Sequence, residues 1–249
     1  MQLEDIQQNL PTYKRDFETA PWLKKETDHY EFLYFAGSLA EKDIEVIVAR
    51  QEKAFAKIIN FLEVPVSEKK IRYFLYPNEE TKKALMGDDW FAQSIYKDFC
   101  IHMLYTETVK PIGEHEDTHL LSLPWGLSIG FFQEGLAEYM VGHDWYGKSH
   151  TDLVTDGLKK NIIPTLYSVM DHKGWSDLDD ESAIYYYSFA GSFVDFLIAM
   201  FGKEKFKELY MRINRSFSKK QNKAIFLEIY HMPVNEAEQQ WRMSLGPTK

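Results

Sequence analysis

The stretch His115-Glu116-Asp117-Thr118-His119 carries the most specific pattern in the chain. Its two histidines are four residues apart, and residues at positions i and i+4 of a helix lie on one face. Both imidazoles can therefore reach one metal ion if this segment is helical. Glu116 follows the first histidine directly, where its carboxylate can contact a water molecule on that metal. The spacing predicts a metal-binding helix.

A third candidate ligand lies farther along the chain. An apolar stretch over residues 120–123 continues the helix, and Pro124-Trp125-Gly126 then ends it. We expect a second helix to begin near Ile129 and to carry Glu134. Two histidines and one glutamate form an established ligand set for catalytic zinc, with the fourth position left for water. The alternative is a surface helix whose charged residues are simply solvated.

Composition limits the classes of protein that the chain can belong to. Hydrophobic residues make up 45% of the 249 residues and aromatic residues 15%, which supplies a substantial core and excludes general disorder. The net charge of −9 argues against nucleic-acid binding, because neutralising phosphates requires clustered lysine and arginine. The sequence contains no run of about eighteen apolar residues, so we expect no transmembrane helix. The oligomeric state stays open.

The first residues, Met1-Gln2-Leu3-Glu4-Asp5, lack the basic region and apolar core of a signal peptide. We therefore expect a cytoplasmic protein as the sequence stands; a secreted or cell-envelope location would require a leader that has been trimmed. Cys100 is the only cysteine, so an intrachain disulfide and a thiolate zinc site are excluded. Its apolar neighbours predict a small buried side chain.

Hydrophobic periodicity predicts an α/β region before the motif and a mainly helical region after it. We expect a long helix from Ser38, a good N-cap residue, to about Leu62. Downstream, an apolar helix opens with the residues around Tyr185 and runs to Met200, and an amphipathic helix follows from Lys203 to about Ser216. A last pair of helices closes the chain. The expected strands cover 29–35, 71–76 and about 98–105, and a short helix covers 79–86.

Several blocks in this order resemble the gluzincins, a group of zinc metallopeptidases, and more closely the small bacterial peptidase MA-like domains. The specific blocks are the HEDTH segment and Phe132-Gln133-Glu134-Gly135-Leu136-Ala137-Glu138-Tyr139; the helix over 187–202 and a tryptophan near the C-terminus support them. The resemblance covers most of the chain from about residue 29. It implies an α+β, zincin-like fold: a small mixed sheet with a long helix, then an active-site helix and a mainly helical C-terminal part. The whole chain, 1–249, would be a single metallopeptidase-like domain, divided into an α/β part (1–112) and a helical part (113–249) with the site between them.

The resemblance also implies roles for individual residues. His115, His119 and Glu134 would bind one zinc ion per chain, and Glu116 would be the general base. Glu138 occupies the place of a carboxylate that supports the ligands; four residues after Glu134, it shares a helical face with it.

A tyrosine that stabilises the transition state has three candidates, Tyr185, Tyr186 and Tyr187. Tyr187 matches the family's position best. Asp117 departs from the pattern, because an apolar residue often follows the glutamate in this family.

Three functions are compatible with these patterns. The first is a zinc-dependent metallopeptidase that acts on a peptide or protein substrate. The second is a catalytically inactive zinc-binding module, regulatory or interacting, derived from a peptidase. The third is a metal-free helical interaction domain with a chance motif. The presence of Glu116 favours the first, because a purely structural zinc site needs no general base.

Overall fold

The computed structural model describes residues 13–144 and 146–246. The N-terminal residues used above to judge a signal peptide lie outside this range. The chain divides into two compact units, one ending at Ser122 and one starting at Leu123. The elements of the first unit are η1 (Asp16–Thr19), β1 (Leu23–Glu26), β2 (Tyr30–Tyr34), α2 (Leu39–Leu62), β3 (Ile71–Tyr76), α3 (Glu79–Met86), β4 (Ala92–Ile95), β5 (Cys100–Leu104) and α4 (Glu114–Leu121). Those of the second unit are η2 (Leu123–Trp125), α5 (Gly130–Val141), α6 (His150–Lys159), η3 (Leu166–Val169), α7 (His172–Ser176), α8 (Ala183–Phe201), α9 (Lys203–Arg212), α10 (Lys219–Tyr230) and α11 (Val234–Ser244).

The first unit is built on a five-stranded mixed sheet in the order β1-β2-β3-β5-β4. The three inner strands are parallel, and the two edge strands run antiparallel to their neighbours. Parallel strands require a crossover connection, which α2 provides between β2 and β3. All five residues of β5 are buried, as expected for a strand covered on both faces. The predicted small mixed sheet is confirmed.

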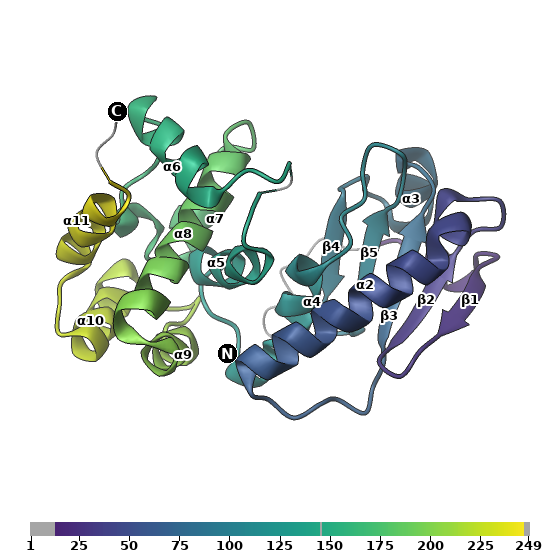
Figure 1. Ribbon diagram of the computed structural model, residues 1–249, viewed down its shortest axis with the longest axis horizontal. Helices are drawn as coiled ribbons and strands as arrows, with labels where there is room; N and C mark the ends of the chain where they lie inside the picture. Colours follow the sequence, from purple (N-terminus) through teal and green to yellow (C-terminus); the bar gives the residue numbers. More distant parts are fainter. Residues whose placement is uncertain (1–12, 145, 247–249) are drawn as a thin grey trace. The chain divides into compact units, whose positions relative to one another are not determined.

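Helix α2 runs across one face of this sheet (Figure 1). Ser38 caps its N-terminus, since its side chain accepts a hydrogen bond from the backbone N–H of Glu41 at 3.2 Å. At the other end Glu63 adopts a left-handed conformation that stops the helix. Its buried side chains include Ile47, Ile58 and Leu62, at helical spacing. The predicted long helix is confirmed.

Pairing between strands decides which residues share a face of the sheet. Ser94 on β4 pairs with Ile101 on β5, and Ile101 pairs with Tyr73 on β3. Side chains of directly paired residues project on the same side. This is the side of α2 and α4, because Tyr73 accepts a hydrogen bond from Gln51 of α2. The opposite face is filled by a cluster of side chains from η1, α3 and the sheet: Phe17, Phe74, Tyr76, Met86, Ile95, Cys100 and Leu104.

His102 lies in that second face and is fully buried. Its Nδ1 atom is 2.9 Å from the Tyr76 hydroxyl, and its ring stacks on Phe74 with centroids 4.4 Å apart. Burial lowers the pKa of His102 well below its usual value, so the ring is neutral. Cys100 is buried beside it, as predicted, and burial raises the pKa of its thiol to about 12.

The second unit is helical, with α5 and α8 packed closely against each other. Phe131 of α5 contacts Phe189 of α8 with ring centroids 4.9 Å apart. Gly135 makes this approach possible, because a Cβ atom there would lie 2.7 Å from the carbonyl oxygen of Ala190. Trp241 of α11 closes the core, and its indole N–H donates to Ser192 at 3.1 Å.

Helix α8 begins at Ala183 and ends at Phe201, close to the predicted bounds. Among the described residues it is the one helix long and apolar enough to span a membrane, with a mean hydropathy of 1.4. However, 56% of that apolar window is buried inside the protein. Core helices of globular proteins meet the same criterion, so packing within the second unit is sufficient to explain its composition.

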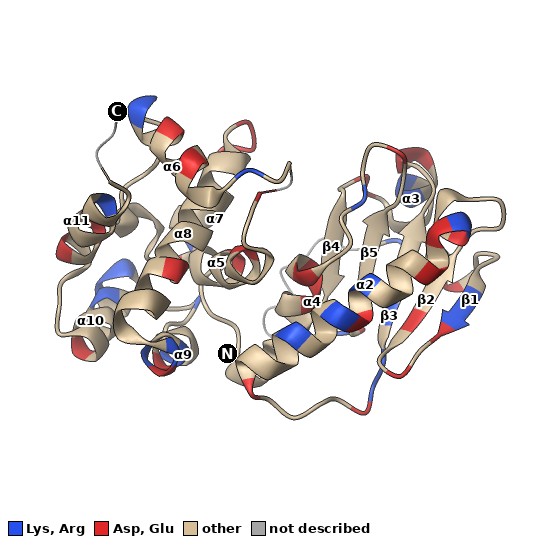
Figure 2. Cartoon of the chain, in the orientation of Figure 1, with Lys and Arg blue, Asp and Glu red and all other residues tan. Residues whose placement is uncertain are grey.

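The other sequence predictions meet mixed outcomes. Strands 29–35 and 71–76 and helix 79–86 are confirmed, whereas α9 ends at Arg212 instead of about Ser216. The edge strands β1 and β4 were not predicted. Charges of both signs are mixed along α2, including on its outer side (Figure 2), and several form exposed ion pairs such as Lys25–Glu45. Such pairs contribute little stability.

Candidate metal centre

Helix α4 holds the two histidines of the motif on one face. The ring centroids of His115 and His119 are 5.0 Å apart and nearly perpendicular. This is the arrangement that the i, i+4 spacing predicts. Gly113 precedes the helix with a φ of 141°, a conformation that residues with side chains rarely adopt. A Cβ atom there would also approach the Arg50 guanidinium at 3.4 Å.

A buried polar network fixes α4 to the sheet through Asp117, which is fully buried. The Tyr30 hydroxyl of β2 donates to Asp117 Oδ2, and Gln51 Nε2 donates to the same oxygen at 3.1 Å. Gln51 also donates to the Gly113 carbonyl at 3.2 Å and to the Tyr73 hydroxyl at 3.1 Å. The network therefore connects the start and the middle of α4 to α2, β2 and β3.

Asp117 is also the residue at which the motif departs from the metallopeptidase pattern that the sequence resembles. Burial raises the pKa of Asp117 well above its usual range, and the charge of Glu116 adds to the increase. The hydrogen bonds from Tyr30 and Gln51 oppose it. Tyr30 and Gln51 thus supply hydrogen bonds to Asp117, at a position where an apolar side chain would otherwise pack against the sheet.

Glu116 is held from the other side by strand β4. Ser94 lies within hydrogen-bonding distance of two acceptors on this residue: Oε2 at 2.6 Å and the backbone carbonyl at 2.9 Å. Only 8% of Glu116 is exposed, so its carboxylate has little freedom to rotate into solvent. Sequence reasoning missed Ser94, because the sequence Ala92-Gln93-Ser94-Ile95 carries no hydrophobic alternation that would mark a strand.

Helix α5 carries Glu134 in the second unit. Its neighbour Gln133 is buried and accepts a hydrogen bond from the Arg215 guanidinium. Arg215 also donates from Nε to the carbonyl of Ser128 at 3.0 Å, immediately before α5 begins. These two contacts fix the first turn of α5. Sequence reasoning missed Arg215, because it lies far from Glu134 along the chain.

Glu138 lies one turn after Glu134 and is 8% exposed, so it is not an ordinary solvated glutamate. Its Oε2 atom is 3.4 Å from His150 Nε2, and His150 Nδ1 is 3.2 Å from the Ser188 hydroxyl. His150 is a buried residue of the helical core. The role of Glu138 in supporting the ligands stays a prediction.

The three candidate tyrosines have different surroundings. The Tyr185 hydroxyl donates to Asp156 at 2.8 Å, and the Tyr186 hydroxyl donates to Asp179 at 2.5 Å. Tyr187 packs against Trp175 with ring centroids 5.6 Å apart. The hydroxyls of Tyr185 and Tyr186 are thus bound to carboxylates. The choice of Tyr187 still rests on the sequence pattern and stays a prediction.

His172, at the start of α7, is a further polar side chain of the second unit that the sequence did not single out. It is half-buried, and burial together with the charge of Arg215 lowers its pKa to about 4, although the charge of Glu134 opposes this. The ring is therefore neutral at physiological pH. The electrostatic effect of Glu134 on His172 could only be found once the fold was known.

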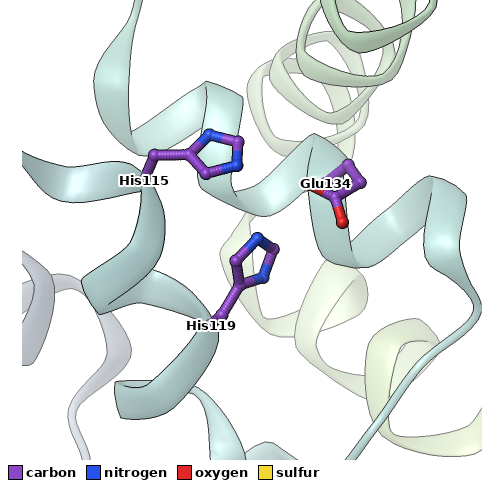
Figure 3. Close-up of side chains that lie close together, drawn as sticks. All are labelled: His115, His119 and Glu134. Atoms are coloured by element: carbon purple, nitrogen blue, oxygen red, sulfur yellow. The ribbon is translucent and has the colours of Figure 1, made fainter. Parts of the chain in front are cut away.

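Figure 3 shows the side chains of His115, His119 and Glu134. One possible ligand atom from each lies within 4.8 Å of the other two. The set comprises two imidazole nitrogens and one carboxylate oxygen, the donors that zinc takes in catalytic sites with three protein ligands. The donor chemistry therefore fits zinc.

Comparisons with known proteins give a likeness in structure and none in sequence. No protein-family model and no curated protein sequence matches the chain. Among solved structures, it is similar to an M1 zinc metallopeptidase from Deinococcus radiodurans, with 16% sequence identity and a TM-score of 0.50. The alignment covers 92% of this chain and 51% of that one, so the chain spans about half the length of the solved structure. The likeness shows that the chain shares the fold of the aligned part of that structure.

Proposed function

We propose that the chain is a zinc-dependent metallopeptidase that hydrolyses peptide bonds of a peptide or protein substrate. The observation that carries the proposal is the grouping of His115, His119 and Glu134, with Glu116 next to the first ligand. The likeness to a structure described as a zinc metallopeptidase supports it. The acidic net charge of −9 supports a partner other than a nucleic acid.

In this proposal His115, His119 and Glu134 hold one zinc ion. Bound zinc would polarise the peptide carbonyl and lower the pKa of a coordinated water to about 7. Glu116 accepts a proton from the attacking water and delivers it to the leaving amine. The Tyr187 hydroxyl donates a hydrogen bond to the carbonyl oxygen as negative charge develops there.

Hydrolysis of a synthetic peptide library, followed by mass spectrometry with and without EDTA, tests this proposal. The parent protein should cut peptides only in the absence of the chelator. Glu116→Gln should reduce the rate about 100-fold or more, because it removes the base and keeps the ligands. Glu114→Gln is the matched control on the same helix, since Glu114 forms a surface ion pair with Lys57; it should retain activity. A protein that binds zinc but cuts no peptide would instead be an inactive zinc-binding module.

A further inference from the structure

Ser94 is the polar side chain on the sheet that contacts the proposed general base. Its hydroxyl lies 2.6 Å from Glu116 Oε2 and 2.9 Å from the Glu116 carbonyl oxygen. No described residue forms a hydrogen bond with the other carboxylate oxygen, Oε1. Ser94 therefore fixes one oxygen of the carboxylate and leaves the second available to a water molecule.

The pairing of β4 determines where Ser94 points. Within this strand, Gln93 and Ile95 are buried and face the side of α3, whereas Ser94 lies on the alternate face with α4. Ser94 pairs with Ile101 of the fully buried strand β5. A shift of one residue in this register would turn Ser94 away from Glu116.

A buried ion pair holds β4 from its opposite face. Lys82 of α3 is fully buried and bonded to Asp88. Asp88 also accepts a hydrogen bond from Gln93 Nε2 at 2.8 Å. Gln93 is adjacent to Ser94, so both neighbouring side chains are fixed, one on each side of the strand. Such a pair favours one arrangement of the strand, because a separated charge would be left buried.

We infer that Ser94 is a positioning residue that holds the Glu116 carboxylate in the orientation in which Oε1 accepts the proton of the attacking water. The inference rests on the proposed peptidase function. The proton moves from water to Oε1 and then to the leaving amine, and the Ser94 hydroxyl keeps its own proton throughout. Misplacing a reacting group by about 1 Å can reduce a rate about 100-fold, so the orientation of one carboxylate has a measurable effect.

The test compares Ser94→Ala and Ser94→Thr with the parent protein. Ser94→Ala should reduce kcat about 10- to 100-fold, while KM and zinc affinity stay within about 2-fold, because the hydroxyl bonds to Glu116 and not to the proposed metal ligands. Ser94→Thr keeps a hydroxyl and suits a strand, so it should recover most of the rate. Ser67→Ala is the matched control, since the one hydrogen bond between the Ser67 hydroxyl and a described residue comes from the backbone N–H of Lys69 on the surface; it should leave kcat unchanged.

Two readouts that do not depend on activity complete the test. In a crystal structure of Ser94→Ala the Glu116 carboxylate should leave its position or occupy more than one rotamer, and in Ser94→Thr it should stay in place. The melting temperature separates a positioning effect from a loss of folding, and it should change little in either variant. A parent that hydrolyses peptides and a Ser94→Ala variant with equal kcat would overturn the inference alone. A parent that does not hydrolyse peptides would overturn the proposed function.

Discussion

Replacing Tyr30 with phenylalanine removes one hydroxyl from the network beneath α4 and preserves the ring. The Tyr30 ring packs on Phe32 and Tyr73, with centroids 5.2 and 6.0 Å apart, and these contacts remain. The hydroxyl is shared between Asp117 Oδ2 and the Gln51 carbonyl oxygen, 3.1 Å away. After the substitution, Gln51 is the one remaining donor to Asp117 among the described residues.

The expected cost follows from burial. Asp117 keeps its bond from Gln51 but loses the bond from Tyr30, and a hydrogen bond to a fully buried carboxyl group contributes about 1–3 kcal/mol. We therefore expect Tyr30→Phe to lower the free energy of unfolding by about 2 kcal/mol. With an m-value of about 2 kcal/mol per molar urea, this shifts the unfolding midpoint by about 1 M. Urea unfolding followed by circular dichroism measures the shift.

Tyr34 offers a matched control, because it lies on the same strand and the same face as Tyr30. Its hydroxyl forms no hydrogen bond to any residue in 13–144 or 146–246, so Tyr34→Phe should change stability by less than about 0.5 kcal/mol. Equal midpoints for the two variants would refute the argument that the Asp117 network stabilises α4. A Tyr30→Phe variant that is more stable than the parent would show that the desolvation cost of burying the network exceeds the stabilisation from its hydrogen bonds.

Three further predictions concern single side chains. The pKa of His102 is depressed in the folded state, so only the unfolded chain takes up a proton as the pH falls through about 6.5, and stability decreases. Between pH 7.5 and 5 the free energy of unfolding of the parent should fall by about 2 kcal/mol more than that of His102→Gln. An equal pH dependence in the two proteins would contradict this. Glu138→Ala should weaken zinc affinity about 10- to 100-fold, as measured by competition with a calibrated chelator. An unchanged dissociation constant would show that Glu138 does not support the metal ligands. Tyr187→Phe should lower kcat and leave zinc binding intact, because losing an oxyanion donor raises the activation free energy by up to about 3–4 kcal/mol. Tyr185→Phe should leave kcat unchanged, and the reverse result would place the oxyanion donor at a different tyrosine.

Long, strongly patterned segments could be predicted from the sequence. Helix α2 has an apolar stripe and a serine N-cap, and both are local features. The spacing of His115 and His119 predicts their common face from helix geometry alone. The resemblance predicted the mixed sheet and helical C-terminal part as well.

The features that the sequence did not predict depend on contacts between distant residues. Strand β4 has two polar residues among its four, and hydrogen bonding to β5 makes it a strand. Asp117 belongs to a run of charged residues that is equally compatible with a solvated helix. Its burial depends on a contact with Tyr30, 87 residues away in the sequence. Ser94 contacts Glu116 for the same reason, because sheet register and not sequence spacing brings the two side chains together.

Zinc content is the measurement that tests the central claim most directly. Protein reconstituted with zinc, dialysed and analysed by plasma mass spectrometry should hold about one zinc per chain. The double variant His115→Ala/His119→Ala should hold none, whereas Glu116→Gln should keep its zinc, and so should His231→Ala, a substitution at an exposed histidine. A parent protein without zinc, or a double variant with undiminished zinc, would contradict the assignment of His115, His119 and Glu134 as the metal ligands.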